Sequence, residues 1–429
     1  MIFAPDYEAR CYWQDDEPLP PEGPASLPRA VDVLVIGSGY TGLAGARETA
    51  LAGRTTLVID AGPVAGGCSS RNGGQVAFSF KPTHPELTAQ HGKAIADGIY
   101  REDMAANAAL AALAKDEGLD FDWRPCGGFL GAHTQRHLRA LVGAFEAQVP
   151  EFAEPFEVLP RHRLSEAIDS PLYHGGVIVS SDASVHPGKL ASALYRRAIA
   201  AGATVVGHCR ALAIRRASVG LEVQTARGLV TARQVLVATN GYTDGVLPWL
   251  QRRVMPVGSY IIATEMLDPE LVRRLIPAAR NVGDTRRVVT YVRPSPDGRR
   301  ILFGGRASAG ETDVTRCAPV MHRMMTEMFP ALSGAKISRA WMGFVGFTFD
   351  TRMHLGEHDG VHYCMGYCGQ GVPLATYYGR HIGRRLANPA VAPSALEGLE
   401  FPSRPYYRGR PWFLPLAVQA YRAMDWLGV

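Results

Sequence analysis

The clearest pattern of apolar and polar positions lies between residues 31 and 60. An apolar run over 31–36, interrupted only by Asp32, precedes three glycines, a helical pattern and a second apolar run over 55–59. Short runs of this kind are typical of strands buried on both faces of a parallel sheet. The pattern therefore predicts a strand, a helix and a second strand that ends at Asp60.

Further elements follow along the chain. Periodicity predicts helices over 84–118, 137–149, 187–201 and 316–329, from about residue 373, and over 410–429. Apolar and alternating runs predict strands within 121–132, 203–206, 211–239, 253–264, 286–305 and 362–366. The strands within 121–132 are expected to pair around a glycine turn. This alternation of strands and helices indicates an α/β fold.

The glycines at 37, 39 and 42 have the spacing G-x-G-x-x-G. In this position Gly37 permits the tight turn, Gly39 lets the backbone approach a pyrophosphate, and Gly42 lets helix and strand pack closely. The helix N-terminus offers N–H groups to the phosphates. Asp60 stands where a carboxylate accepts hydrogen bonds from ribose hydroxyls. The pattern predicts a dinucleotide site; the alternative is a glycine-rich turn in an ordinary β-α-β unit.

Two other segments combine glycine with polar residues. The loop 61–76 carries Arg71 and is too polar and glycine-rich to be a core element, which favours close backbone approach to a ligand. The alternative is a surface turn with one solvated arginine. The glycines at 366, 369 and 371 precede a predicted helix, whose N-terminus is a second anion-stabilising device.

Length and composition describe a globular protein of more than one domain. The chain has 429 residues, 47% of them hydrophobic, and a net charge of +5, which does not require nucleic acid as a partner. No spacing of cysteine and histidine suits a metal site. The seven scattered cysteines, the acidic and proline-rich N-terminus and the lack of a long apolar run favour a reduced, cytoplasmic compartment. For the C-terminal helix, packing on the protein is favoured over membrane contact.

Three observations favour FAD over NAD as the dinucleotide. The glycine motif lies at the start of the folded chain, and the loop 61–76 follows Asp60 directly, where the ribityl chain and ring of a flavin would extend. There is no second G-x-G-x-x-G for a separate nicotinamide cofactor, and no redox C-x-x-x-x-C near the first motif.

Several blocks in their order carry a resemblance to a known family. They are GSGYTGL (37–43), SSRNGGQ (69–75), HPGKL (186–190), ATNGYT (238–243), LFGGR (302–306) and GYCGQGV (366–372). The chain resembles the D-amino-acid-oxidase superfamily of FAD enzymes, and within it the γ-glutamylputrescine oxidoreductase-like branch, from about residue 12 to 385. The resemblance implies a glutathione-reductase-type FAD-binding domain interleaved with a mostly antiparallel α+β substrate domain. It also implies oxidation of a C–N bond in an amine or amino acid to an imine.

The resemblance assigns roles to individual residues. Asp60 stands where the family usually has Glu at the adenosine ribose, and Gln370 replaces a His that is frequent in the branch. The strand with Tyr291 and Arg293 matches the one on the substrate side of the flavin. The candidate catalytic residues are Arg71, Tyr291, Arg293 and Gln370. The candidate FAD-binding residues are Gly37, Ser38, Gly39, Tyr40, Thr41, Gly42, Asp60, Ala61, Ser69, Ser70, Arg71, Asn72, Gly73, Gly74, Gln75, Ala211, Thr239, Asn240, Gly241, Gly369, Gln370, Gly371 and Val372.

Two departures from the family affect the expected chemistry. Relatives that hold FAD covalently use a Cys on the strand that reads RAWMGF here (339–344), so we expect non-covalent FAD. Relatives that react with oxygen place a Lys near the flavin, and ILFGGR (301–306) has none. The electron acceptor is therefore oxygen or a carrier. Hydride transfer to flavin N5 needs positioning more than a base, so no catalytic base is assigned.

The sequence leaves alternatives open. A flavin dehydrogenase for a secondary or N-alkyl amino acid, passing electrons to a quinone or carrier, is one. A flavin-binding, non-catalytic subunit of a larger oxidase is another. The expected ranges are a lead-in (1–29), an FAD-binding domain (30–80, 160–250 and 340–400), a substrate domain (81–159 and 251–339) and a C-terminal helical extension (401–429).

Overall fold

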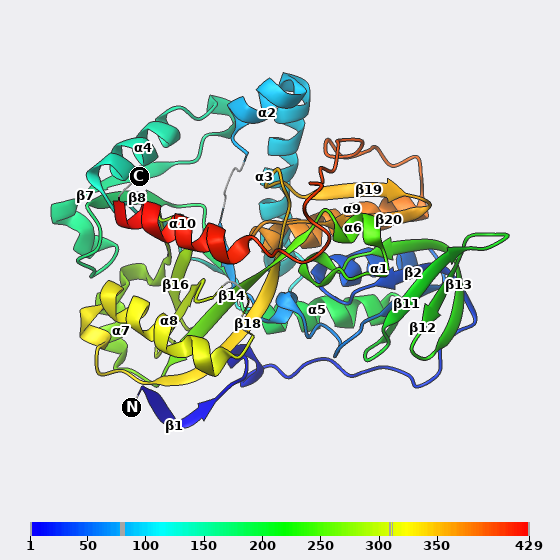
Figure 1. Ribbon diagram of the computed structural model, residues 1–429, viewed down its shortest axis with the longest axis horizontal. Helices are drawn as coiled ribbons and strands as arrows, with labels where there is room; N and C mark the ends of the chain where they lie inside the picture. Colours follow the sequence, from blue (N-terminus) through cyan, green and yellow to red (C-terminus); the bar gives the residue numbers. More distant parts are fainter. Residues whose placement is uncertain (1, 78–81, 309, 311, 428–429) are drawn as a thin grey trace.

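The structure is a computed structural model that describes residues 2–77, 82–308, 310 and 312–427, and two large sheets organise it (Figure 1). The first has the strand order β10-β3-β2-β13-β12-β11, with β20 and β19 added beside β13. The second has the order β1-β18-β14-β17-β16-β15-β6-β8-β7. A small third sheet joins β4 (Gln75–Val76), β9 (Ala183–Ser184) and β5 (Arg124–Pro125).

The eight-stranded sheet contains the predicted strand–helix–strand unit. Its parallel strands are β10 (Thr204–Val206), β3 (Thr56–Ile59), β2 (Ala30–Ile36), β13 (Gly228–Val237) and β20 (Val361–Met365). Antiparallel strands extend it: β12 (Leu221–Thr225), β11 (Ala211–Arg216) and β19 (His354–His358). The central strands β2 and β3 are almost wholly buried, as their apolar runs predict.

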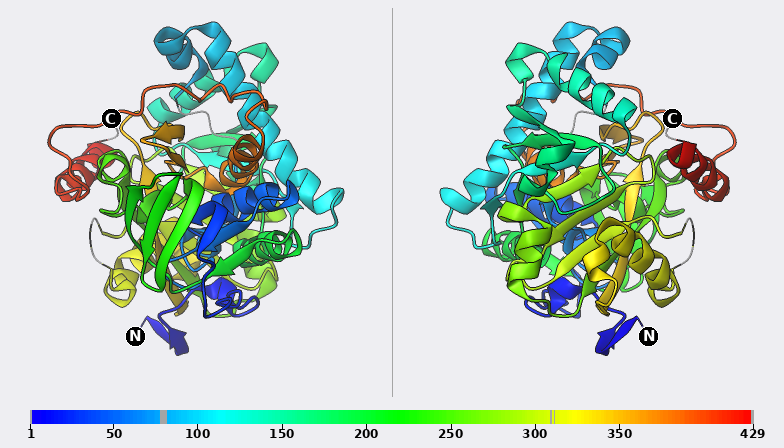
Figure 2. Two further views of the ribbon diagram at one scale, coloured as in Figure 1. Left: turned by 90° about the vertical axis from the view of Figure 1, so that its right-hand side faces the viewer. Right: turned by 90° about the vertical axis from the view of Figure 1, so that its left-hand side faces the viewer.

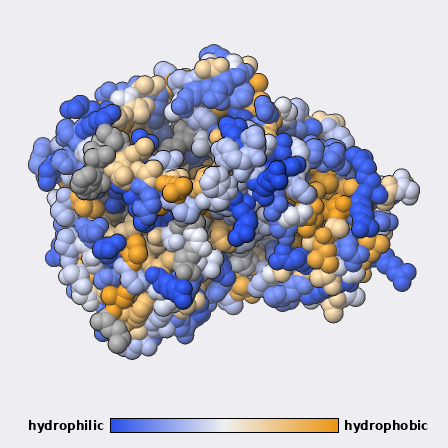
Figure 3. All heavy atoms as spheres, in the orientation of Figure 1, coloured by the Kyte–Doolittle hydropathy of each residue, from blue (hydrophilic) through white to orange (hydrophobic). Residues whose placement is uncertain are grey.

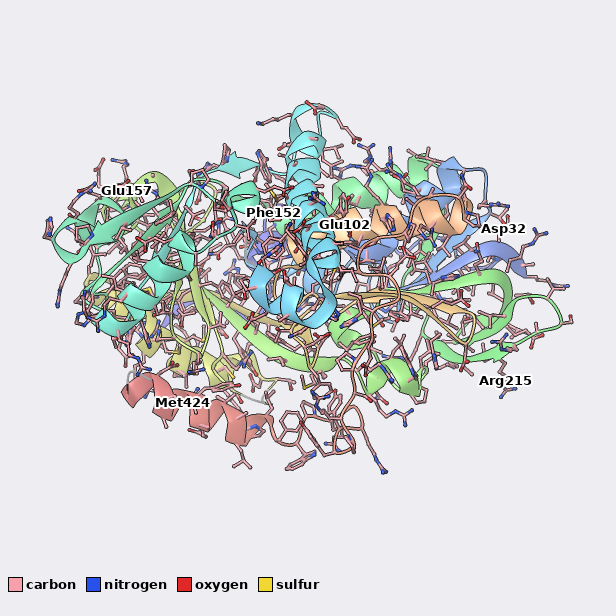
Figure 4. The ribbon with its side chains drawn as sticks, turned by 90° about the horizontal axis from the view of Figure 1, so that it is seen from above. Asp32, Glu102, Phe152, Glu157, Arg215 and Met424 are labelled. Carbon is pink, nitrogen blue, oxygen red and sulfur yellow. The ribbon has the colours of Figure 1, made fainter. Side chains whose placement is uncertain are left out.

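Helices α1 (Tyr40–Leu51), α5 (Pro187–Ala200) and α9 (Gly371–Ala387) cover this sheet, and α3 (Lys93–Lys115) packs on α9. Glycines allow α1 and α9 to cross closely. A Cβ on Gly379 would lie 2.6 Å from the carbonyl oxygen of Thr41, and one on Gly383 would lie 2.4 Å from that of Gly45. Since no larger residue fits there, backbone contact fixes the two helices against each other. Glu102 of α3, labelled in Figure 4, accepts a hydrogen bond from Tyr378 of α9.

The nine-stranded sheet is mostly antiparallel and has two covered faces. Its strands are β1 (Phe3–Glu8), β18 (Ile337–Phe347), β14 (Met255–Thr264), β17 (Ile301–Gly305), β16 (Thr290–Pro294), β15 (Asn281–Asp284), β6 (Gly128–Gly131), β8 (Gly175–Val179) and β7 (Phe156–Pro160). Helix α8 (Val314–Met328) packs with α7 (Pro269–Leu275) on one face. The opposite face lies toward the eight-stranded sheet, and α4 (Gln135–Glu146) lies beside β8.

Both predicted parts of the fold class are confirmed, and three local predictions need correction. The helix over 84–118 is two helices, α2 (His84–His91) and α3, because Gly92 has a φ of +84°. The strands within 121–132 do not pair with each other. Gly127, with a φ of +69°, turns the chain from β5 in the small sheet to β6 in the large one. Helix α9 begins at Gly371, two residues before the position expected.

The chain crosses between the two large sheets several times. Strand β8 and residues 340–347 of β18 belong to the nine-stranded sheet, although the sequence placed them in the FAD-binding ranges. Strand β1 of the lead-in also joins that sheet. The expected boundary between residues 80 and 81 lies outside the described residues, and the domain ranges stay a prediction.

The terminal segments lie at the periphery, with β1 at one edge and α10 (Leu414–Leu427) along one side (Figure 2). The outer side of α10 exposes Leu416 and Met424, and Met424 is labelled at the edge of the molecule in Figure 4. Polar residues cover most of the face seen in Figure 3, with separate apolar patches. Within the described part of the chain, no helix combines the length and hydropathy needed to cross a membrane.

Candidate active site

The glycine motif forms a tight turn from β2 into α1. Gly37 has a φ of +108°, and its N–H donates to the carbonyl of Ile59 in β3 over 2.8 Å. A Cβ on Gly42 would lie 1.9 Å from the carbonyl oxygen of Gly37. No side chain caps α1 from its N-cap residue Gly39. Among the described residues, none accepts a hydrogen bond from the N–H of Thr41 or Gly42.

Asp60 lies at the end of β3 and binds the first turn. Its Oδ2 accepts hydrogen bonds from the N–H and the hydroxyl of Ser38, over 2.8 and 2.6 Å. Its Oδ1 accepts from the N–H of Gly62 over 3.0 Å. A carboxylate has further lone pairs, so Asp60 can still accept from ribose hydroxyls while it holds the turn. Ala61 is exposed beside it, and Ala211 begins β11 next to Cys209, whose N–H donates to the carbonyl of Asp60.

The loop 61–76 is ordered by its own polar side chains. Ser69 Oγ accepts from the N–H of Tyr40, and Ser70 Oγ donates to the carbonyl of Ala65 over 2.7 Å. Asn72 donates to the carbonyl of Ser69 and accepts from the N–H of Gly74. The bonds of Ser70 and Asn72 hold the loop in shape from within, and the bond of Ser69 joins it to the N-terminus of α1.

Two indoles from distant parts of the chain fasten the same loop. Trp13, fully buried in the lead-in, donates from Nε1 to the carbonyl of Asn72 over 2.8 Å. Trp341 of β18 donates from Nε1 to the carbonyl of Arg71, also over 2.8 Å. The lead-in therefore helps to hold the loop of candidate FAD-binding residues.

The loop lies against one face of the nine-stranded sheet. A Cβ on Gly73 would lie 2.8 Å from the Tyr291 ring, and one on Gly304 would lie 2.0 Å from the same ring. The Tyr291 hydroxyl hydrogen-bonds Ser259 Oγ over 2.9 Å. Burial raises the pKa of Tyr291 well above its ordinary value, so the phenol stays protonated. Gln75 donates to the carbonyl of Val292 over 2.9 Å and ties the loop to β16.

The structure gives the two candidate arginines different surroundings. Arg293 is 4% exposed, and its Nη1 donates to the carbonyls of Gly74 and Val185 over 3.0 and 2.8 Å. Burial lowers the pKa of Arg293 to about 10, which leaves it charged at neutral pH. Arg71 donates from Nε to the carbonyl of Gly66 over 2.7 Å. The contacts of Arg293 therefore favour a structural role in the loop over the substrate-orienting role expected from sequence.

The second glycine cluster places the N-terminus of α9 beside that of α1. Gly369 has a φ of +102°, and Gln370 is the N-cap residue of α9 without a side-chain cap bond. Within the described residues, the N–H groups of Gly371 and Val372 have no acceptor. Thr41 Oγ1 and the hydroxyl of Tyr367 share a hydrogen bond of 2.6 Å.

The turn after β13 supports the same cluster. Thr239, Asn240 and Gly241 lie at the carboxyl end of that strand, with Asn240 at a φ of +44°. Asn240 Oδ1 accepts from the N–H of Gly366 over 2.9 Å. A Cβ on Gly241 would lie 2.7 Å from the carbonyl oxygen of Phe344, so the turn packs tightly on β18.

A pocket opens beside Gln370, between α3, α9 and residues 351–353. Its lining includes Asp103, Arg352, Tyr367, Gln370 and Leu374. Burial raises the pKa of Asp103 to about 7, although the hydroxyl of Tyr378 donates to it over 3.4 Å. The described residues hold no cluster of three or more His, Cys, Asp or Glu that suits a metal ion.

A family model described as FAD dependent oxidoreductase matches residues 32–385. The chain therefore belongs to this family of FAD-dependent oxidoreductases, and the predicted resemblance to the D-amino-acid-oxidase superfamily is confirmed. FAD is accordingly its cofactor.

Relatives extend over nearly the whole chain. A probable oxidoreductase OrdL of Rhizobium meliloti (strain 1021) is 32% identical over 416 residues, which cover 95% of this chain and 95% of the relative. The gamma-glutamylputrescine oxidoreductase of Escherichia coli (strain K12) is 30% identical over 403 residues, 93% of each chain. The solved structure of glycine oxidase from Geobacillus kaustophilus has a TM-score of 0.71 at 21% identity, covering 89% of this chain and 99% of that one. It shows the same fold.

The residues present fit FAD. Four backbone N–H groups without a described acceptor lie at two helix N-termini, those of Thr41, Gly42, Gly371 and Val372. Such groups suit phosphate oxygens and the electron-rich edge of a flavin. The glycines at 37, 39 and 42 keep side chains out of the turn, since a Cβ on Gly39 would lie 2.8 Å from Ser69 Oγ. Asp60, which follows β3, supplies a carboxylate that suits the ribose hydroxyls.

Sequence reasoning missed several residues at this site. Trp13, Trp341 and Ser259 contact the loop or Tyr291, yet no local motif marks them. Gly379 and Gly383 do carry a signal, because two glycines four apart on a helix leave a groove on one side of it. The assignment of individual FAD-binding residues stays a proposal.

Proposed function

We propose that this protein oxidises the C–N bond of an amine or amino acid to an imine. The observation that carries the proposal is the position of the loop 69–75, between the N-terminus of α1 and the Tyr291 face of the nine-stranded sheet. In the relatives named above, gamma-glutamylputrescine oxidoreductase and glycine oxidase, the names state amine and amino-acid substrates.

FAD, when bound, supplies the two-electron acceptor that takes a hydride from the carbon beside the nitrogen. The chain positions the substrate and stabilises the negative charge that develops. The N–H groups at the start of α9 and the neutral side chain of Gln370 stabilise negative charge at their end of the site. Tyr291, protonated and fixed by Ser259, gives the substrate side an aromatic wall with one hydroxyl.

No residue needs to act as a catalytic base. The substrate has to be a neutral amine, because a protonated nitrogen has no lone pair to support hydride loss. The buried wall around Tyr291 disfavours a charged ammonium group, which supports that form. We therefore expect turnover to rise with pH as the amine of the substrate loses its proton.

The attachment of FAD is proposed to be non-covalent. Gly343 occupies the face of β18 next to the loop, and its nearest sulfur is that of Cys68. Burial raises the pKa of the Cys68 thiol to about 11, so it is neutral at pH 7 and a poor nucleophile. None of the seven cysteines, all of which lie in the described residues, forms a disulfide.

The electron acceptor is proposed to be a quinone or another carrier, with oxygen as the alternative. The strand β17 and the residue after it read ILFGGR and lack a lysine. This absence favours a dehydrogenase; a dehydrogenase for a secondary or N-alkyl amino acid is one form of it.

Anaerobic mixing with a panel of amines, N-alkyl amino acids and D-amino acids tests the proposal. Loss of the flavin absorbance with at least one of these classes is expected, and a flavin that none of them reduces would sink the idea. Admitting oxygen afterwards separates an oxidase, which regains its colour within seconds, from a dehydrogenase. Acid precipitation should leave a colourless pellet; a yellow pellet would show covalent flavin.

A further inference from the structure

The C-terminal helix α10 has the reverse of the polarity that a surface helix usually shows. Its only two charged residues, Arg422 and Asp425, both bind the protein body. Arg422 donates to the backbone carbonyls of Arg306 and Ala307, over 3.4 and 3.0 Å. Asp425 accepts from two backbone N–H groups that follow β15, over 2.8 and 3.0 Å. The charged groups of the helix are therefore used inward.

The outer side of α10 is left without charge. Leu416 is 70% exposed, and Met424 is exposed two turns further along the helix. Helix α10 does pack on the protein, as the sequence favoured, but only through its inner side. There Leu414 and Val418 join an apolar cluster with β14 and β18. Figure 2 shows the helix standing out from the body of the molecule.

The segment that leads into α10 adds aromatic and basic groups to this region. Tyr406 and Trp412 are exposed, and both contact Phe413 edge-on, with ring centroids 5.5 and 5.8 Å apart. Arg408 and Arg410 are exposed and have no ion-pair partner among the described residues. Together with Leu416 and Met424, the two aromatic residues and the two arginines form what we call the C-terminal surface. From residue 402 to 424 the chain has four arginines and no acidic residue.

This combination suits a partner that is both apolar and anionic. A second copy of the chain fits poorly, because in a two-fold symmetric contact the same patch faces itself. Arg408 and Arg410 would then approach their own counterparts. The surface of an anionic bilayer fits on each count. Trp and Tyr prefer the headgroup level, apolar side chains enter the acyl boundary, and arginine is attracted to anionic lipids.

We propose that the C-terminal surface docks this protein on an anionic lipid bilayer. The contact is peripheral, because a helix of 14 residues is about 21 Å long and the hydrocarbon core is about 30 Å thick. Val257, against which α10 packs, lies two residues before Ser259 on the same face of β14. Since Ser259 binds Tyr291, the bilayer would lie beside the Tyr291 side of the candidate site. The inference does not depend on the proposed C–N oxidation.

Flotation of the FAD-loaded full chain with lipid vesicles tests the proposal. One set of vesicles is phosphatidylcholine alone, and the other is an equal mixture with the anionic lipid phosphatidylglycerol. Wild-type protein should bind the mixed vesicles, with a partition coefficient at least about tenfold above that for phosphatidylcholine. Added salt should weaken the binding, because it screens the arginines.

Two pairs of substitutions separate the apolar and the basic contributions. Leu416→Ser with Met424→Ser should lower the partition coefficient for mixed vesicles at least about tenfold, because the apolar contact is lost. Arg408→Gln with Arg410→Gln should lower it by about thirtyfold at low salt, since each arginine near an anionic surface contributes about fivefold. The four side chains are exposed, so the variants should fold as wild type does.

The matched control pairs lie in and after β11. Leu212→Ser with Val219→Ser removes two exposed apolar side chains, and Arg215→Gln with Arg216→Gln removes two exposed arginines. Arg215 and Met424 are far apart in Figure 4. Both control pairs should bind mixed vesicles as wild type does.

Three results would overturn the inference. The first is a wild-type protein that does not bind the mixed vesicles, and the second is equal binding by wild type and Leu416→Ser with Met424→Ser. The third is a wild-type dimer, measured by light scattering, that this pair of substitutions converts to a monomer, since the surface would then be a contact between copies. Flavin reduction by the substrate panel tests the proposed function separately, because vesicle binding is measured without substrate.

Discussion

The indole of Trp13 donates a hydrogen bond of 2.8 Å to the carbonyl oxygen of Asn72, across 59 positions of the sequence. It joins the lead-in to the loop that faces Tyr291. The edge-to-face contact of Trp13 with His186 at the start of α5, with ring centroids 4.8 Å apart, orients the indole for that bond.

Trp13→Phe should loosen the loop while it retains most of the apolar packing. The lost bond leaves a buried carbonyl without a donor, so we expect about 1–2 kcal/mol less stability and a weaker affinity for FAD. Chemical denaturation and FAD titration of the apoprotein measure the two effects. Trp412→Phe is the control, because Trp412 also donates to a carbonyl but is 64% exposed. Equal effects of the two substitutions would contradict this role of Trp13.

Gly42→Ala should disrupt the turn that the phosphates require. Its Cβ would lie 1.9 Å from the carbonyl oxygen of Gly37, and backbone must move to relieve that contact. We expect a loss of about 1–3 kcal/mol and purification with little FAD. Gly143→Ala, in the interior of α4 with open space around it, should instead gain about 0.5–1 kcal/mol. A Gly42→Ala variant with full FAD content would refute the assigned close packing.

Arg293→Met should affect the cofactor more than the substrate. The change leaves the carbonyls of Gly74 and Val185 without their donor, at a cost of about 3 kcal/mol, and releases the loop. FAD retention during dialysis should fall, whereas Arg299→Gln, in the exposed turn before β17, should retain FAD as wild type does. If Arg293→Met retained FAD as wild type does, the structural role given to Arg293 would be contradicted.

Asp103 should make stability depend on pH. Its pKa is raised from the ordinary 3.8 to about 7, so between these values the folded protein holds a proton that the unfolded chain has lost. The contribution is complete below about pH 4 and disappears as the pH rises through 7. Asp103→Asn should remove this loss, gaining about 1–2 kcal/mol over wild type at pH 8. A shift of three pKa units would correspond to about 4 kcal/mol. We expect a smaller gain because Asp103 is only half-buried.

Thermal unfolding of wild type and Asp103→Asn at pH 5 and pH 8 measures this difference. Asp116→Asn, at the exposed end of the same helix, should follow the wild-type pH dependence. Parallel curves for wild type and Asp103→Asn would show that Asp103 titrates near its ordinary value.

The sequence could predict the unit from Val31 to Asp60 because its determinants are local. Apolar runs define β2 and β3, and the glycine spacing defines the turn between them. The loop 61–76 was visible for the same reason. Strand pairing was harder to predict. Strands β5 and β6 are neighbours in sequence but join different sheets, because β5 pairs with β9 (Arg124 with Ser184) and β6 pairs with β8 (Gly128 with Val179), far along the chain.

The contacts of Arg293 could not be predicted for a related reason. Tyr291 and Arg293 share a face of β16, and this suggested a common function at the substrate side. What distinguishes Arg293 is a carbonyl 108 positions away, that of Val185.

The glycine crossing of α1 and α9 has a consequence for motion. Because Gly379 and Gly383 bring the two backbones into direct contact, the helix N-termini at Gly39 and Gln370 belong to one rigid body. We therefore expect the surface formed by these two helix N-termini to keep the same shape whether or not FAD is bound. We expect any movement that admits a substrate to occur outside this pair of helices.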